Sequence, residues 1–442
     1  MCMVVQSETA EDVPWFKEVY QHNGGDCSSV NLLSLFSGCG GMDLGFEGDF
    51  VCLKKSINTN IHSDWIKEDM GDWVRLKPTV FDTVFANDIR PDAKVAWETY
   101  FKKHKDDADQ VYHLESIVDL VRKAKNGESI FPENIDIVTG GFPCQDFSIC
   151  GKRNGFNSKK SHTGKILESD APSVENRGHL YMWMREVITM TKPKLFVAEN
   201  VKGLTNLDDV KTVIEHDFAE AGNGGYLVVP AQVLYAPDYG VPQSRERVIF
   251  FGFRKNALTD KAMEALSETN IPDRYNPYPP KTHGDIGSDL YPRVTCKDAF
   301  IGLDEPENSK DISQQKYSKA KYMGSHCQGQ VEVKLDSVSP TIRSEHHGNI
   351  EFRRLSLEHG GKHYEELNQG LKERRLTVRE CARLQTFPDE YQFIIDSSVA
   401  KKGASVSSSD AYKIIGNAVP CVLAYNIAKN LEDKWDLYFE KV

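Results

Sequence analysis

The sequence predicts a Rossmann-like α/β domain, with helices on both faces of a mixed sheet, followed by a smaller loop-rich domain. Between residues 30 and 255, short apolar runs typical of buried strands alternate with stretches that carry apolar residues at helical spacing. This alternation is lost between residues 256 and 371, where prolines and polar residues accumulate. We therefore expect a weakly structured extension over 1–29, a first domain over 30–255, a second over 256–371, and a segment over 372–442 that returns to the first domain.

The composition is that of a soluble globular protein, with 40% hydrophobic and 27% charged residues in a chain of 442. The chain has no apolar run long enough to span a membrane and no secretory pattern near residue 1, so we expect neither. The ten cysteines are sparse and form no CxxC or Cys/His pattern, which favours a reducing cytosolic compartment without a structural metal. The net charge of −11 argues against a protein that coats nucleic acid, but allows a local basic face.

The first predicted strand, residues 30–36, runs into a glycine-rich turn at Ser37-Gly38-Cys39-Gly40-Gly41. A strand, a glycine turn and a helix start in this order are typical of sites where backbone N–H groups meet a nucleotide-like cofactor. The spacing differs from GxGxxG, and no Lys-Ser/Thr pair follows as a phosphate loop requires. The turn therefore favours a cofactor with an adenosine but no pyrophosphate, such as S-adenosylmethionine.

A second predicted strand, residues 83–88, ends in Asp88 and precedes a helical pattern over 91–101. A carboxylate at this strand end could bind ribose hydroxyls, or Asp88 could be the N-cap of the helix. Asp88 lies some fifty residues beyond the glycine turn, where about twenty is usual. We therefore interpret residues 51–79 as an insertion.

A third predicted strand, residues 135–139, leads through Gly140, Gly141 and Pro143 to Cys144. We expect the glycines to allow a sharp turn and the proline to stiffen it, which would hold Cys144 at a strand end. Most single cysteines are simply small buried side chains, so this one needs further support as a nucleophile. The next stretch, residues 151–165, contains five cations and no acid.

Further strands and helices follow, with polar residues beside them. A helix over 180–190 precedes a strand over 195–198 that ends at Glu199, and a strand over 248–253 follows Arg245 and Arg247. Two arginines at i and i+2 on an extended segment share a face, where they could bind an anion or a carbonyl. Thr377 and Glu380 have capping-box spacing and predict a helix start. Residues 412–420 are expected to form a tight turn before a last helix over 421–431.

Residues 310–354 combine eight Lys/Arg with five acids, an excess of three positive charges. This segment could face phosphates, although a solvated loop surface is an equally good interpretation.

In this order the motifs resemble those of bacterial DNA (cytosine-5)-methyltransferases, and the resemblance covers nearly all of residues 31–431. The glycine turn from Phe36 resembles the cofactor motif of the family, and Gly141-Phe142-Pro143-Cys144-Gln145 its nucleophile loop. Four further motifs match: Glu199-Asn200-Val201, Gln243-Ser244-Arg245-Glu246-Arg247, Arg375-Leu376-Thr377 with Arg379-Glu380, and Gly416-Asn417-Ala418-Val419-Pro420.

The resemblance implies an S-adenosylmethionine-dependent methyltransferase fold, with 30–255 as the catalytic domain and 256–371 as a target-recognition domain. The enzyme would flip a cytosine out of a specific duplex DNA sequence and methylate its carbon 5. Cys144 would add to carbon 6, a protonated Glu199 would contact ring nitrogen 3, and Arg247, with Arg245 nearby, would hold the base carbonyl. The residues implied for cofactor binding are Phe36, Ser37, Gly38, Cys39, Gly40, Gly41, Asp88, Ile89, Ser116, Pro143, Asn417 and Val419.

The basic stretch after Cys144 resembles the mobile catalytic loop of the family, so Lys152, Arg153, Lys159 and Lys160 would contact the DNA backbone. Ser339-Pro340-Thr341-Ile342 resembles a short recognition element, which implies DNA contacts by Thr341 and Arg343. Two positions depart from the family pattern: Ile89 replaces an aromatic residue, and Ser116 replaces an aspartate.

The resemblance leads us to expect a monomer that acts on duplex DNA in a bacterial cytoplasm, in association with the nucleoid, and protects the DNA from a cognate restriction endonuclease. Two alternatives remain open at this stage. One is an RNA cytosine-5 methyltransferase acting on tRNA, and the other is a catalytically silent DNA-binding homologue.

Overall fold

The computed structural model describes residues 29–143, 180–206, 210–285, 290–344, 349–395 and 405–439. Its centre is a seven-stranded sheet with the strand order β6-β5-β1-β7-β8-β10-β9. The strands are β1 (Val30–Leu35), β5 (Phe81–Asp88), β6 (Tyr112–Leu114), β7 (Ile137–Gly141), β8 (Leu195–Val201), β9 (Tyr226–Tyr235) and β10 (Glu246–Arg254). Strand β10 is antiparallel to both neighbours, whereas the other pairings are parallel. The predicted mixed sheet is confirmed.

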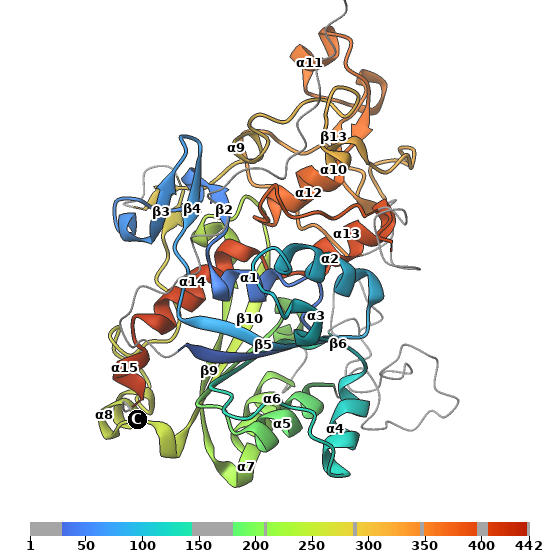
Figure 1. The fold of residues 1–442 in the computed structure, drawn as a ribbon. Helices are drawn as coiled ribbons and strands as arrows, with labels where there is room; N and C mark the ends of the chain where they lie inside the picture. Colours follow the sequence, from blue (N-terminus) through green and yellow to red (C-terminus); the bar gives the residue numbers. More distant parts are fainter. Residues whose placement is uncertain are drawn as a thin grey trace, which may run out of the picture.

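Helices cover both faces of this sheet (Figure 1). One face carries α4 (Ile117–Lys125), α5 (Leu180–Thr191), α6 (Val210–Ala219) and α7 (Ala221–Gly224), and the other carries α1 (Gly41–Glu47), α2 (Pro91–Phe101), α3 (Ala108–Val111) and α14 (Cys421–Glu432). Side chains alternate between the two apolar cores along each strand, so Ile137 joins one core and its neighbour Val138 the other. The strands and helices predicted for the first domain therefore lie where the periodicity placed them.

Two turns expected from glycine content are regular structure instead. Gly140 and Gly141 belong to β7, with pairing partners in β1 and β8. Residues 412–417 are the last part of α13 (Ser408–Asn417), which Ser407 caps by accepting a hydrogen bond from the Asp410 backbone N–H. The predicted tight turn over 412–420 is therefore wrong up to residue 417, because buried apolar side chains at helical spacing outweigh the single glycine there.

The insertion at 51–79 is a small antiparallel sheet with the order β2-β4-β3. Its strands are β2 (Val51–Leu53), β3 (Ile66–Asp69) and β4 (Trp73–Leu76). Val74 and Leu76 are fully buried in the main core, and Trp65 packs edge-on against Tyr425 of α14 at a ring-centroid distance of 5.4 Å. The insertion is therefore a folded addition anchored on α14.

The described parts of residues 256–371 (256–285, 290–344 and 349–371) contain short elements, as their composition predicts. These are α8 (Asp260–Leu266), β11 (His283–Gly284), β12 (Tyr291–Pro292), α9 (Cys296–Ala299), α10 (Ile312–Gln315), β13 (Phe352–Arg354) and α11 (Tyr364–Asn368). The orange elements of Figure 1 gather beyond the α1 side of the sheet, together with α12 (Val378–Leu384) and α13 of the next segment. That segment also contributes β14 (Arg374–Arg375) and α15 (Trp435–Tyr438).

Candidate active site

The candidate catalytic pair lies where β8 and β10 adjoin. Glu199 is near the carboxyl end of β8, and Arg247 is the second residue of the antiparallel β10, opposite Val201. Opposite strand directions bring the end of one strand and the start of the other to the same edge of the sheet. There, Arg247 Nε forms an ion pair with Glu199 Oε1 over 2.5 Å, and each residue is less than a tenth exposed.

The pKa of the Glu199 carboxyl is shifted upward. Burial raises it, while the positive charges of Arg247 and Arg245 act in the opposite direction. A buried carboxyl with a raised pKa holds its proton at a higher pH than an exposed glutamate, so it is suited to donate a hydrogen bond or a proton.

Gly141 leaves room for this carboxyl. The residue pairs with Glu199 across β7 and β8, and a Cβ at Gly141 would lie 2.8 Å from Glu199 Oε2. Neither Gly140 nor Gly141 has a positive φ, so the expected sharp turn is not the reason for these glycines. Glycine is required at 141 because the Glu199 carboxyl lies so close to its backbone that a methyl group there would displace this carboxyl.

We expect Gly141→Ala to lower the methylation rate by about tenfold or more, because a displacement near 1 Å in an active site is costly. Gly140→Ala is the matched control, since its Cβ would meet the flexible Met184 side chain at 3.0 Å. Single-turnover rates and thermal unfolding of both variants would check this. Equal rate losses in both would contradict a specific role for the space at Gly141.

Asn200 holds the backbone that leads to Cys144. Its Nδ2 donates to the Phe142 carbonyl oxygen over 3.2 Å, and Phe142 packs against Tyr181 and Phe218. Sequence reasoning gave Asn200 no individual role, although it lies within a recognised motif. Cys144 itself lies outside the described residues, as do Lys152, Arg153, Lys159 and Lys160.

Arg245 lies close to Arg247 in the sequence, but its guanidinium group has different partners. Its guanidinium donates to the carbonyl oxygens of Gly416 and Ala418, each over 2.8 Å, and to that of Ile342 over 3.1 Å. Only 1% of the residue is exposed, so its role is to join three chain segments beside the site. Arg247 forms the ion pair with Glu199, whereas these hydrogen bonds of Arg245 go to backbone carbonyl groups. A joint role of both guanidinium groups at one ligand stays a prediction.

Two tyrosine hydroxyls donate hydrogen bonds to the backbone of the glycine turn after β1. Phe36, Gly38 and Gly40 have positive φ angles of 54°, 55° and 75°. Tyr112 donates its hydroxyl to the Gly38 carbonyl over 2.9 Å, and Tyr391 donates to that of Cys39 over 2.5 Å. These contacts stabilise a left-handed backbone that Phe36, as a non-glycine residue, adopts only at a cost.

Asp88 is bound to the same turn. Its carboxylate accepts hydrogen bonds from the backbone N–H groups of Gly38 and Arg90, both over 3.0 Å. The N-cap of α2 is Arg90, so the alternative of Asp88 as that N-cap is wrong. Burial raises the pKa of Asp88, and the two N–H groups oppose this.

Two exposed aliphatic residues adjoin Asp88. Ile89 follows β5 and Leu114 ends the neighbouring β6, and both are 42% exposed although apolar. Two exposed aliphatic side chains beside a carboxylate offer a flat ring one apolar surface and a polar partner. Leu114 was not singled out from the sequence, because only the pairing of Asp88 with Leu114 places it there.

The remaining predicted cofactor residues have mixed surroundings. Ser116 caps α4 by accepting a hydrogen bond from the Val118 backbone N–H, which gives it a local structural role. Asn417 is exposed at the end of α13, while the Val419 carbonyl lies so close to Gly41 that a Cβ there would be 2.3 Å away. Pro143 is half-buried directly after Phe142.

The sequence profile of the family described as C-5 cytosine-specific DNA methylase matches residues 30–433. The chain belongs to this family. It is a DNA cytosine-5 methyltransferase, and the resemblance recognised in its motifs is confirmed. The enzyme is 32% identical to the type II methyltransferase M.BsuRI of Bacillus subtilis, over 90% of this chain and 78% of that protein. It is also 32% identical to M.BspRI of Lysinibacillus sphaericus, over 91% and 81%.

Solved structures show the same fold at lower identity. A putative DNA modification methyltransferase encoded within an Escherichia coli prophage has a TM-score of 0.52 at 19% identity, covering 92% of this chain and all of that one. The Dnmt2 methyltransferase of Schizosaccharomyces pombe has a TM-score of 0.50 at 17% identity, over 92% and 99%. Within the part of the chain that the structure describes, no helix of this enzyme could cross a membrane and no group of side chains forms a metal site.

The predicted recognition residue Thr341 lies at a seam between 339–342 and 242–245, and Arg343 follows directly after it. The Ser244 backbone N–H donates to the Ser339 carbonyl over 2.8 Å, and the Thr341 hydroxyl donates to the Ser244 carbonyl. Arg343 forms an ion pair of 3.0 Å with the buried Glu351. Both residues therefore have partners within the protein.

The basic excess in 310–354 is distributed unevenly. Its three arginines, Arg343, Arg353 and Arg354, are paired with glutamates, so they do not form a free phosphate-facing surface. The lysines of the segment are exposed: Lys310, Lys316, Lys319, Lys321 and Lys334. A surface that contacts phosphates would thus consist of lysines. The charge count overstated the positive charge available there, because it included the paired arginines.

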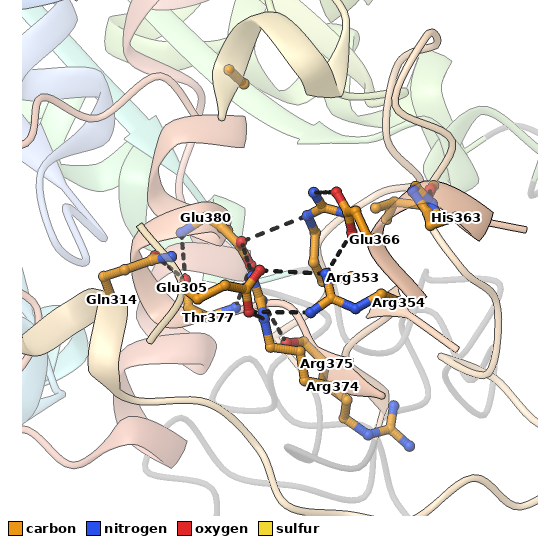
Figure 2. Close-up of polar contacts among 12 residues, drawn as sticks. Glu305, Gln314, Arg353, Arg354, His363, Glu366, Arg374, Arg375, Thr377 and Glu380 are labelled. Carbon is orange, nitrogen blue, oxygen red and sulfur yellow. Dashed lines mark hydrogen bonds and ion pairs between the residues drawn. The ribbon is translucent and has the colours of Figure 1, made fainter. Parts of the chain in front are cut away.

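Arg353 and Arg354 belong to a largely buried ionic cluster, shown in Figure 2. Arg374 donates to Glu380 through both terminal nitrogens over 2.9 Å and to Glu305 through Nε over 2.9 Å. Arg354 forms ion pairs with Glu305 and Glu366. This cluster links α12 to β13 and β14 and so fixes the base of the predicted recognition domain.

Proposed function

We propose that this methyltransferase acts on a flipped-out cytosine in duplex DNA through a covalent bond between Cys144 and carbon 6 of the base. The observation that carries the proposal is the buried Glu199–Arg247 pair, which lies beside the strand that leads to Cys144. A protonated carboxyl and a guanidinium side by side match the ring nitrogen 3 and the carbonyl oxygen of cytosine.

In this proposal Cys144 attacks carbon 6, which places negative charge on the ring and makes carbon 5 nucleophilic. Glu199 donates to ring nitrogen 3, and Arg247 stabilises the developing charge at the carbonyl oxygen. When bound, S-adenosylmethionine supplies the methyl group for carbon 5. Loss of the carbon-5 proton to a base then expels the Cys144 thiolate and restores the aromatic ring.

The chain's own residues fit the cofactor. The glycine turn 36–41 and Asp88 offer backbone N–H groups and a carboxylate, while Ile89 and Leu114 offer an apolar surface for adenine. Phe36 lies on the same turn, and the Val419 carbonyl oxygen lies against Gly41 at its end. Asn417 of the last motif and Pro143 of the nucleophile loop would complete the site. Ser116 remains the weakest member of the set because it already caps a helix.

Residues 256–371 would act as the target-recognition domain, with exposed lysines and the basic stretch after Cys144 contacting phosphates. The relatives named as type II methyltransferases support a role within a restriction-modification system, as a partner of an endonuclease that cuts the unmethylated sequence. Such an enzyme acts as a monomer on DNA in the bacterial cytoplasm.

Trapping on duplex DNA that contains 5-fluorocytosine tests the proposal. Fluorine at carbon 5 blocks the final proton loss, so the wild type should form a stable adduct that survives denaturing electrophoresis. Cys144→Ser should form none. Absence of an adduct with the wild type would favour the catalytically silent alternative, and methylation of tRNA alone would favour the RNA alternative.

A further inference from the structure

A buried carboxyl group lies beneath the cofactor turn, and the proposed mechanism does not use it. Asp43, in α1, is completely buried, and its Oδ1 accepts a hydrogen bond of 2.5 Å from the Ser34 hydroxyl of β1. Ser34 Oγ in turn accepts a hydrogen bond of 2.8 Å from the hydroxyl of Ser37, which is part of the turn. A continuous chain of hydrogen bonds therefore connects Asp43 to the cofactor turn.

The other oxygen of Asp43 connects to the turn by a second route. Asp43 Oδ2 accepts a hydrogen bond of 2.8 Å from Trp97 Nε1, and the Trp97 ring lies directly under Gly40, where a Cβ would be 2.5 Å from its Cδ1. The ring also packs on Tyr112, whose hydroxyl holds the Gly38 carbonyl. Asp43 is thus connected to the turn through Ser34 on one side and through Trp97 on the other.

The protonation of Asp43 determines the direction of the serine chain. As a carboxylate, Asp43 only accepts, so the Ser34 hydroxyl points to it and Ser37 donates to Ser34. Ser37 Oγ then accepts one hydrogen bond, from the Asn87 backbone N–H over 3.2 Å, and can accept another from a ligand.

As a neutral acid, Asp43 can donate to Ser34, whose hydrogen then turns to Ser37 Oγ and fills that second position. Ser37 keeps a partner for its own proton, because the Ser34 carbonyl oxygen lies 3.1 Å away.

We propose that Asp43 is a positioning residue that couples cofactor affinity to pH, by setting whether Ser37 can accept a hydrogen bond from the ligand. The inference rests on the proposed use of the turn for S-adenosylmethionine. Asp43 contacts neither the cofactor nor the base and acts only through Ser34 and Ser37.

The relevant pH range lies near neutrality. Burial raises the pKa of Asp43 to about 6, against the hydrogen bonds from Ser34 and Trp97. The charged groups that face it are Glu47 on the same helix, which raises the pKa, and Lys105 after α2, which lowers it. Cys39, Tyr112, Tyr391 and Cys421 are further titratable groups near Asp43, and burial raises the pKa of each. Asp43 is therefore ionised above about pH 6, and cofactor affinity should fall as the pH drops through that value.

Calorimetric titration of the full chain with S-adenosylhomocysteine, from pH 5 to pH 8, tests the coupling. The wild type should bind about fivefold more weakly at pH 5 than at pH 8, the usual effect of one lost hydrogen bond. Asp43→Asn, whose amide group can donate to Ser34, should bind weakly at every pH. Ser34→Ala breaks the chain while Asp88 stays intact, so it should lose the change near pH 6.

Glu47→Gln is the matched control, because Glu47 lies one turn along α1 outside the serine chain. It should keep the loss of affinity in acid, with the midpoint moved to lower pH because the Glu47 charge no longer raises the pKa of Asp43. Thermal unfolding of each variant identifies a folding defect, and if Asp43→Asn fails to fold, Ser34→Ala still decides. A wild-type profile in Ser34→Ala would assign the pH dependence to Asp88 and overturn the inference. If the wild type bound S-adenosylhomocysteine equally well from pH 5 to pH 8, the inference about Asp43 would be overturned and the cofactor assignment would stand. If it did not bind at any pH, the cofactor assignment would be overturned as well.

Discussion

Glu199→Gln should lower the rate of DNA methylation by about 10²- to 10⁴-fold, the usual contribution of a positioned acid. Glutamine keeps the shape and a hydrogen-bond donor for ring nitrogen 3, but it cannot transfer a proton to the ring. The ion pair of 2.5 Å with Arg247 is also lost. Single-turnover transfer of a tritiated methyl group to duplex DNA measures the chemical step directly.

The pH dependence distinguishes an acid from a simple donor. The pKa of Glu199 is raised by burial, so the wild-type rate should fall as the pH rises through that pKa and the carboxyl loses its proton. Glu199→Gln should lack this decrease. Glu246→Gln, at an exposed neighbour of Arg247 that pairs with Lys202, should keep both rate and profile. If the rate of Glu199→Gln still fell at alkaline pH, the decrease would have to come from a group other than Glu199.

The second large effect is on stability. We expect Glu380→Gln to lower the free energy of unfolding by about 3 kcal/mol, because it leaves a buried guanidinium without one of its two carboxylates. Glu380 accepts both terminal nitrogens of Arg374 and the Thr377 backbone N–H, and its side chain is 2% exposed. Urea denaturation measures the change.

An exposed ion pair gives the control for this prediction. Asp69 is 50% exposed and pairs with Lys54, so Asp69→Asn should change the free energy of unfolding far less than Glu380→Gln does. Equal effects of Asp69→Asn and Glu380→Gln would contradict the importance of burial.

Acid should weaken the same cluster. Although burial acts to raise it, the pKa of Glu305 is lowered from 4.5 to about 2 by Arg374 and Arg354. A carboxyl whose pKa is lower in the folded state stabilises the fold above its unfolded pKa, and this contribution is lost as the pH falls from 4.5 toward 2.

Most of the central sheet could be predicted from the sequence, because its strands are short apolar runs that end in polar residues. The positions of Glu199, Arg247 and Asp88 at strand ends followed from the same pattern. The pairing of Glu199 with Arg247 required knowledge that β10 runs antiparallel to β8, which no local pattern reveals. The hydrogen bonds of Arg245 also could not be foreseen, because they reach carbonyl groups more than a hundred residues away in Gly416 and Ala418.

Glycines misled the prediction for a related physical reason. A glycine can permit a positive φ, as Gly38 and Gly40 do, or it can make room for a neighbour, as Gly141 does for Glu199. The sequence does not distinguish these uses, because the neighbour lies on another strand. The same limit applies to the arginines of 310–354, whose partners could not be seen in a charge count.

The seam between 339–342 and 242–245 has a consequence for how new specificities could arise. Main-chain atoms form its hydrogen bonds between Ser244 and Ser339 and between Ser339 and Pro242, so their formation does not depend on which side chains the outer loops carry. Mutations in those loops can alter the surface offered to a ligand while the attachment beside Arg245 stays in register. The outer loops can thus change without any change in this main-chain attachment.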